Sequence, residues 1–135
     1  MKISFKKFLP GIAWFFIILV LLFLPVDDIP SVDSSFLEKI YFDKWVHFGL
    51  FALLVLFFCW PFYNSSFNST ERLQYFIKIA IAACVLGLAS ELIQKYITTS
   101  RDFELLDWVA DSLGVLVAFW FSRKKFLKKH STITE

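Results

Sequence analysis

The sequence predicts an all-α integral membrane protein, a bundle of four transmembrane helices. Three observations indicate this class. Of the 135 residues 58% are apolar and only 19% are charged, whereas a typical soluble domain is roughly 45–50% apolar. Four hydrophobic segments approach the length of about 20 residues that a membrane-spanning helix needs. The basic residues gather where the cytoplasmic ends of such helices would lie. The composition also excludes a disordered chain, a collagen-like fibre and a disulfide-rich scaffold.

The four expected helices differ in how clearly their hydrophobic sequence indicates a membrane span. The first, residues 9–26, has no charge, and no small-residue cleavage site follows it, so we expect a retained span rather than a signal peptide. The second, residues 45–63, contains His47. The third and fourth, residues 74–97 and 105–122, carry several charged side chains. A buried helical hairpin of a soluble domain is therefore the alternative for this half of the chain.

The distribution of positive charge favours four crossings with both termini in the cytoplasm. Lysines and arginines gather in residues 2–7, residues 72–78 and residues 123–129, and the positive-inside rule places such clusters on the cytoplasmic side. The basic residues on the outer side are then Lys39, Lys44, Lys95 and Arg101. The whole chain, residues 1–135, is expected to form this single membrane domain.

The first outer loop, residues 27–43, is acidic and contains a helix signal of its own. Ser35 and Glu38 have the spacing of a capping box, and apolar residues follow on one helical face. We expect a short interfacial helix that lies on the outer membrane surface.

Eight polar residues from distant parts of the sequence should meet near the outer surface. Helical spacing places His47 one turn after Asp43, and Asp111 one turn after Asp107, so each pair shares a helix face. An isolated charge at mid-membrane costs at least about 2.5–3.5 kcal/mol, and intramembrane ionisable groups are functional candidates by default. A network that only stabilises the fold is the alternative. The predicted ligand-binding or polar-network residues are Asp43, Lys44, His47, Glu91, Gln94, Arg101, Asp107 and Asp111.

These residue types allow several kinds of chemistry. His47 with Asp43 or Glu91 offers an acid–base pair, and Lys44 with Arg101 offers a clamp for an anion or phosphate. The carboxylates and the histidine are also metal-ligand types. Their spacing matches no metal motif, however, and no nucleophile motif is evident, so we assign no metal, no cofactor and no catalytic residue. The pattern favours an outward-facing polar pocket over a specific reaction.

The polar residues form the pattern Asp43-Lys44-x-x-His47-Phe48, then Glu91-x-x-Gln94, Arg101, Asp107 and Asp111-x-x-Gly114. This pattern resembles the VanZ-like family of small bacterial membrane proteins. The resemblance covers all four helices, with its signature residues in the last three. The family often has Asn where this chain has Asp111. The resemblance implies a multi-pass protein of the bacterial cytoplasmic (inner) membrane. The family's founding member is associated with resistance to the glycopeptide antibiotic teicoplanin.

The expected function is that of a cell-envelope membrane protein whose outward-facing pocket binds a polar headgroup or a glycopeptide-like ligand, with a link to teicoplanin-type resistance implied by the resemblance. The alternative is a membrane-embedded enzyme that acts on a lipid-linked envelope precursor, with His47 as general base and Arg101 as the clamp. A small ion-coupled carrier is a third hypothesis. The expected partner is a membrane lipid or a lipid-linked cell-wall molecule, and nothing indicates nucleic acid.

Overall fold

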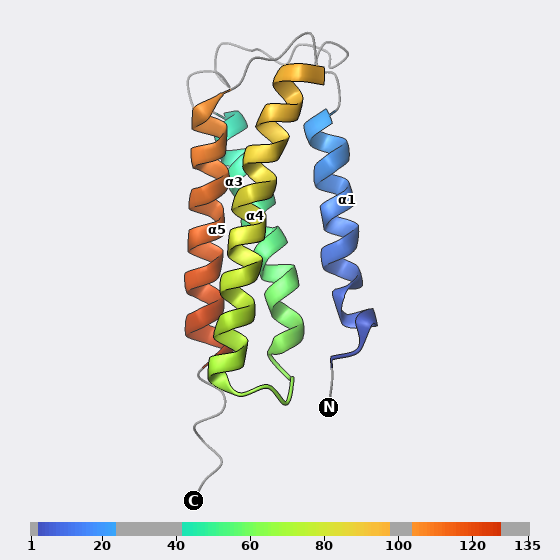
Figure 1. Ribbon diagram of the computed structural model, residues 1–135, viewed down its shortest axis with the longest axis vertical. Coiled ribbons are helices and arrows are strands. Elements are labelled where there is room, and N and C mark those ends of the chain that lie inside the picture. The colour runs from blue at the N-terminus through green and yellow to red at the C-terminus, as the bar shows by residue number, and fades with distance from the viewer. Residues whose placement is uncertain (1–2, 24–41, 98–103, 128–135) are drawn as a thin grey trace, which may run out of the picture.

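The computed structural model contains four long helices that run side by side (Figure 1). It describes residues 3–23, 42–97 and 104–127, and no strand occurs among them. A 3-10 turn, η1 (Phe5–Phe8), leads into α1 (Leu9–Phe23). Helix α3 (Phe42–Cys59) ends in a second 3-10 turn, η3 (Trp60–Phe62), and is followed by α4 (Ser69–Ile97) and α5 (Leu105–Phe126). The four expected helices are therefore present in the expected order.

Two of the helices, α4 and α5, are longer than the sequence predicts, and α3 is displaced toward the N-terminus because it ends at Cys59 instead of residue 63. Helix α3 begins at Phe42 instead of residue 45, α4 begins at Ser69 instead of residue 74, and α5 continues to Phe126 instead of residue 122. Each of these boundaries was predicted beside a charged or polar residue. Such residues are favourable in the terminal turns of a helix, so the helices continue past them. Residues 24–26 of the first predicted span and the predicted interfacial helix in residues 27–41 lie outside the described part of the chain.

The early start of α4 has a local cause. The Asn68 side-chain oxygen accepts a hydrogen bond from the Glu71 amide (2.8 Å), and the Glu71 carboxylate accepts one from the Asn68 amide (2.9 Å). This reciprocal pair is a capping box, which satisfies two backbone N–H groups that the first turn would leave unpaired.

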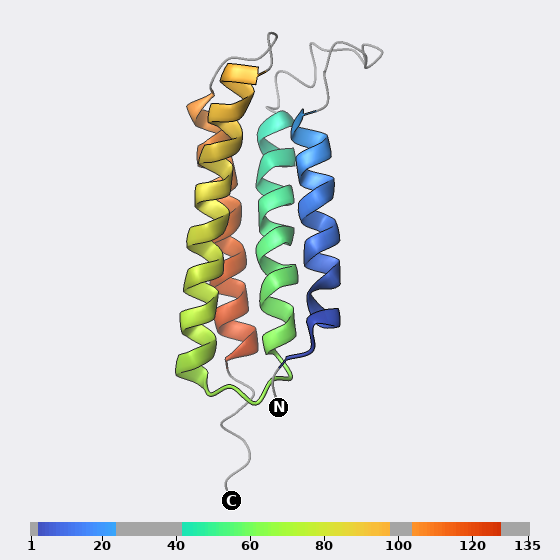
Figure 2. The same cartoon turned by 45° about the vertical axis from the view of Figure 1, so that its right-hand side comes forward.

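Helix α3 lies at the centre of the bundle, between α5 and α1 (Figure 2). Its contact with α5 is the most extensive and depends on Gly114, because a Cβ atom there would collide with the backbone carbonyl of Phe48. Helix α1 packs on α3 through Gly11, where a Cβ atom would meet the Phe58 ring at 3.1 Å. Small residues thus set the separation between the helices, as is common for helices in membranes.

Apolar side chains cover the outside of the bundle as well as its core. Core residues such as Phe51, Val55 and Val115 are fully buried, while Phe16, Val85 and many other apolar side chains are exposed. A helix that is apolar on all sides is typical of a membrane span or a deeply buried helix. All four helices are long and apolar enough to cross a membrane.

The two ends of the bundle differ in charge. At one end lie η1 with its lysines, the 63–68 connection and the last turn of α5, which contains Arg123, Lys124 and Lys125. At this end Arg72 is buried and donates to three backbone carbonyls, those of Ser65 (2.7 Å), Phe67 (2.9 Å) and Phe126 (3.1 Å). The opposite end is rich in carboxylates.

Candidate functional site

The acidic end of the bundle is formed where α3 and α5 begin and α4 ends. Its surface layer is centred on Lys44, whose ammonium group lies 2.6 Å from Asp43 Oδ2 and also contacts Glu104 and Asp107. We call these three carboxylates the outer acidic group. The side chains of Asp43 and Glu104 are each 56% exposed, so this layer is open to a ligand.

A buried layer lies one turn further into the bundle. His47 Nδ1 is 3.0 Å from Asp111 Oδ1, and His47 Nε2 is 3.8 Å from Asp107 Oδ2. Glu91 comes from α4, and its Oε2 atom accepts a hydrogen bond of 3.4 Å from the backbone amide of Glu104. One ligand-type atom from each of His47, Glu91 and Asp111 lies within 4.8 Å of the other two. We call these three residues the buried triad.

The fold makes room for the triad at Gly87. A Cβ atom at this position would lie 2.9 Å from Asp111 Oδ2, so glycine lets the carboxylate approach the backbone of α4. Glu91 follows Gly87 by one helical turn and therefore lies on the same face of α4. The expected convergence of His47, Glu91 and Asp111 from three helices is observed.

The acidic end holds more negative than positive groups. Among the described residues, the carboxylates of the outer acidic group and the triad face one lysine and one histidine. Glu91 Oε1 and Asp111 Oδ2 are buried and have no hydrogen-bond partner within the described ranges. Burial of a carboxylate oxygen without a partner is costly. The arrangement is thus suited to a positively charged ligand or ion.

One predicted site residue, Gln94, has its partner elsewhere, and another, Arg101, is outside the part of the chain that the structure describes. Gln94 is buried, but its side-chain amide donates to the backbone carbonyl of Leu22 at 2.7 Å and so joins α4 to α1. Arg101 lies outside the described residues. The predicted anion clamp therefore has only Lys44 among the described residues, and its ammonium group is already surrounded by carboxylates.

Sequence reasoning missed the role of Glu104. This residue is absent from the eight predicted polar-network residues. The structure brings its carboxylate to Lys44 and its backbone amide to Glu91. Its position three residues before Asp107, one turn along the chain, was the signal that could have identified it.

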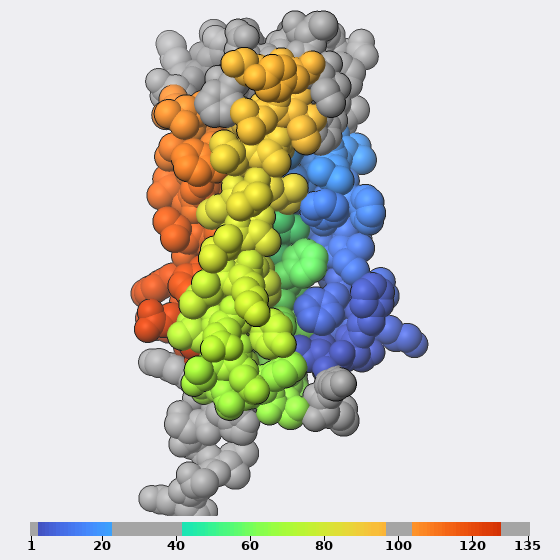
Figure 3. Space-filling view, in the orientation of Figure 1, coloured from blue at the N-terminus to red at the C-terminus, as the bar shows by residue number. Residues whose placement is uncertain are grey.

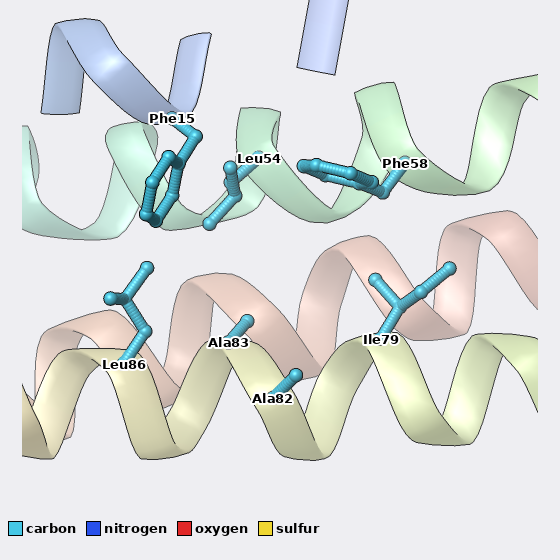
Figure 4. Close-up of a pocket in the computed structure, with 7 residues that line it drawn as sticks. All are labelled: Phe15, Leu54, Phe58, Ile79, Ala82, Ala83 and Leu86. Atoms are coloured by element: carbon cyan, nitrogen blue, oxygen red, sulfur yellow. The ribbon is translucent and has the colours of Figure 1, made fainter. Parts of the chain in front are cut away.

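An apolar pocket of about 290 Å³ lies further along the bundle, between α1, α3 and α4 (Figure 4). Phe15, Leu54 and Phe58 line one side, and Ile79, Ala83 and Leu86 line the other. In the space-filling view, atoms of α3 are visible between α4 and α1 (Figure 3). None of the described residues that line this pocket is ionisable, so it is suited to an apolar group.

Comparison with known proteins gives one informative relative. An uncharacterized protein of the fission yeast Schizosaccharomyces pombe is 38% identical over 76 residues, which are 56% of this chain and 43% of that protein. The chain thus matches less than half of the length of this relative. No family model and no solved structure matches the chain.

These findings correct the expected family. The resemblance to the bacterial VanZ-like proteins is wrong, because no family model matches and the matched relative is fungal. The motif residues are real, but a handful of polar positions in an apolar bundle recurs too easily to identify a family. A bacterial inner-membrane location and a link to antibiotic resistance rested on that resemblance and are not supported.

Proposed function

We propose that this chain is a multi-pass membrane protein that binds an amphiphile with a cationic, amine-bearing headgroup. The headgroup would contact the outer acidic group, and the apolar chain would extend toward the pocket between α1, α3 and α4. The observation that carries the proposal is the excess of carboxylates at the acidic end, where three of them share one lysine.

The charge of the two ends supports an orientation in the membrane. The end that contains η1, Arg72 and the last turn of α5 is basic, and basic ends lie preferentially on the cytoplasmic side. Four crossings then leave the acidic end on the opposite side of the membrane, where it would meet headgroups of that leaflet.

The distance between the two parts of the site fits a lipid chain. Asp43 and Leu54 are eleven residues apart on α3, which corresponds to about 16 Å along a helix. This length is close to half of the hydrocarbon thickness of a bilayer, which is about 30 Å. An amphiphile whose headgroup is held at the outer acidic group would therefore place the end of its chain near the apolar pocket.

The test compares single-chain amphiphiles that differ only in the headgroup. Native mass spectrometry of the purified protein in detergent would measure the binding of hexadecylamine, hexadecanol and hexadecanoic acid. We expect the amine to bind at least about tenfold more tightly than the acid, a difference of about 1.4 kcal/mol. Equal binding of the three, or preference for the acid, would contradict the proposal.

A second candidate function is a hydrolase or transferase that acts on a lipid-linked precursor. The hydrogen bond between His47 and Asp111 favours it, because a carboxylate that orients an imidazole is a common arrangement for a general base. Purified protein would be incubated with labelled lipid-linked phosphate precursors. Product formation that His47→Gln abolishes would support this function, and equal product with both proteins would count against it.

A further inference from the structure

The buried triad differs from the outer acidic group in composition and burial. His47, Glu91 and Asp111 are 6%, 1% and 0% exposed, and they come from three helices. They combine one imidazole with two carboxylates, and their ligand atoms lie within 4.8 Å of one another. We propose that this triad binds one divalent transition-metal ion between α3, α4 and α5.

The observed spacing fits a single ion. Two donor atoms at about 2.1 Å from a metal, set about 90–110° apart, are separated by about 3.0–3.4 Å. His47 Nδ1 and Asp111 Oδ1 are 3.0 Å apart, so an ion can replace the proton that joins them with little movement of either helix. A ligand atom of Glu91, from α4, lies within 4.8 Å of a ligand atom of each, so a small movement of this side chain would bring it to the same ion.

Two unpartnered oxygens point independently to a ligand. Glu91 Oε1 and Asp111 Oδ2 are buried, and neither has a hydrogen-bond partner among the described residues. Asp111 Oδ2 faces α4 at Gly87, one turn before Glu91, so it is directed toward the face of α4 that bears the other carboxylate. A buried polar atom is normally paired, and a metal ion bound by Glu91 and by both carboxylate oxygens of Asp111 would pair both of these atoms.

Charge balance favours a divalent ion over further hydrogen bonds. A neutral imidazole and two carboxylates would carry the opposite charge to a divalent cation, so the loaded site would be neutral. This removes much of the cost of two buried charges. Asp107 Oδ2, 3.8 Å from His47 Nε2, is placed as the outer carboxylate that commonly orients a metal-binding histidine.

The donor set indicates the class of ion. Imidazole suits zinc, iron, nickel and copper, and carboxylates suit manganese, whereas magnesium and calcium prefer sites made only of oxygen. Three protein ligands leave a coordination position for water, as in catalytic zinc sites. We therefore expect Zn²⁺ or Mn²⁺ to bind in preference to Mg²⁺.

The experiment uses the full-length chain without a histidine tag, in detergent, after treatment with EDTA and without added amphiphile. Equilibrium dialysis followed by elemental analysis would measure bound Zn²⁺, Mn²⁺ and Mg²⁺. We expect about one Zn²⁺ or Mn²⁺ per chain, and at least a tenfold loss of affinity in Glu91→Gln and Asp111→Asn. The matched control is Asp43→Asn in the outer acidic group, which should retain the ion.

X-ray absorption on the zinc-loaded wild-type protein keeps the test decisive if a variant fails to fold. It should show one imidazole and otherwise oxygen ligands. The proposal is overturned by sub-stoichiometric binding in the wild type, by a zinc shell without imidazole, or by variants of the triad that bind as well as Asp43→Asn does.

Discussion

His47 and Asp111 are 64 positions apart in the sequence, yet their side chains lie 3.0 Å apart and join the second turns of α3 and α5. Because both side chains are buried, removal of one leaves the other without its partner. In metal-free protein we expect Asp111→Ala to lower the free energy of unfolding by about 1–3 kcal/mol. Asp111→Asn can still form a hydrogen bond with His47, so it should lower the free energy of unfolding by less than Asp111→Ala does. Thermal unfolding in EDTA measures both, and equal losses would contradict the role of this contact.

Gly114 allows α5 to approach α3 closely. In Gly114→Ala the new Cβ would collide with the carbonyl of Phe48, and backbone atoms cannot move aside as a flexible side chain can. We expect a loss of about 1–3 kcal/mol in the free energy of unfolding. Gly49→Ala on α3 is the matched control, because a Cβ there meets nothing within 4 Å. Helix propensity predicts that this control is neutral or stabilising by up to about 1 kcal/mol.

Lys44 separates the three carboxylates of the outer acidic group. Lys44→Met should destabilise the protein by about 1 kcal/mol, because the acids then repel one another at partly exposed positions. The loss should shrink at high salt, which screens exposed charges. The double variant Lys44→Met, Asp107→Asn should recover part of the stability that Lys44→Met loses. A loss that is independent of salt and of Asp107 would indicate that packing of the lysine stem, not charge, is responsible.

Arg72 stabilises the basic end through three backbone carbonyls rather than through acids. Arg72→Met leaves these carbonyls unpaired and should cost about 2–4 kcal/mol, since hydrogen bonds to charged groups contribute more than neutral ones. Lys78→Met, one to two turns further along α4 and exposed, is the control and should change stability little. Chemical unfolding of the two variants in detergent gives the comparison. Similar unfolding midpoints for Arg72→Met and Lys78→Met would refute the role assigned to Arg72.

The number and order of the helices could be predicted from the sequence because long apolar segments separated by charged turns leave few other arrangements. The convergence of His47, Glu91 and Asp111 followed from helical spacing and from depth along each helix. These rules use only local periodicity and length, which the amino-acid order contains directly.

Gln94 illustrates what local periodicity does not determine. Its spacing from Glu91 places it near the same face of α4, but spacing does not reveal which neighbouring helix it meets, and the structure turns it toward Leu22 of α1. The role of Arg72 at the basic end was missed for a related reason. Its partners are backbone carbonyls, two in the connection before α4 and one at the end of α5, and a backbone carbonyl leaves no pattern in the sequence. The start of α4 was predictable in principle from Asn68 and Glu71, which have capping-box spacing.

The central claim is that the acidic end binds a cationic ligand and does not merely hold the helices together. The most direct measurement compares hexadecylamine binding and thermal unfolding in the double variant Asp43→Asn, Glu104→Gln, with Glu71→Gln at the basic end as control. Because both replaced side chains are 56% exposed, the account predicts an unchanged unfolding temperature and at least a tenfold loss of amine binding. Unchanged binding together with a lowered unfolding temperature would show a network that serves only the fold.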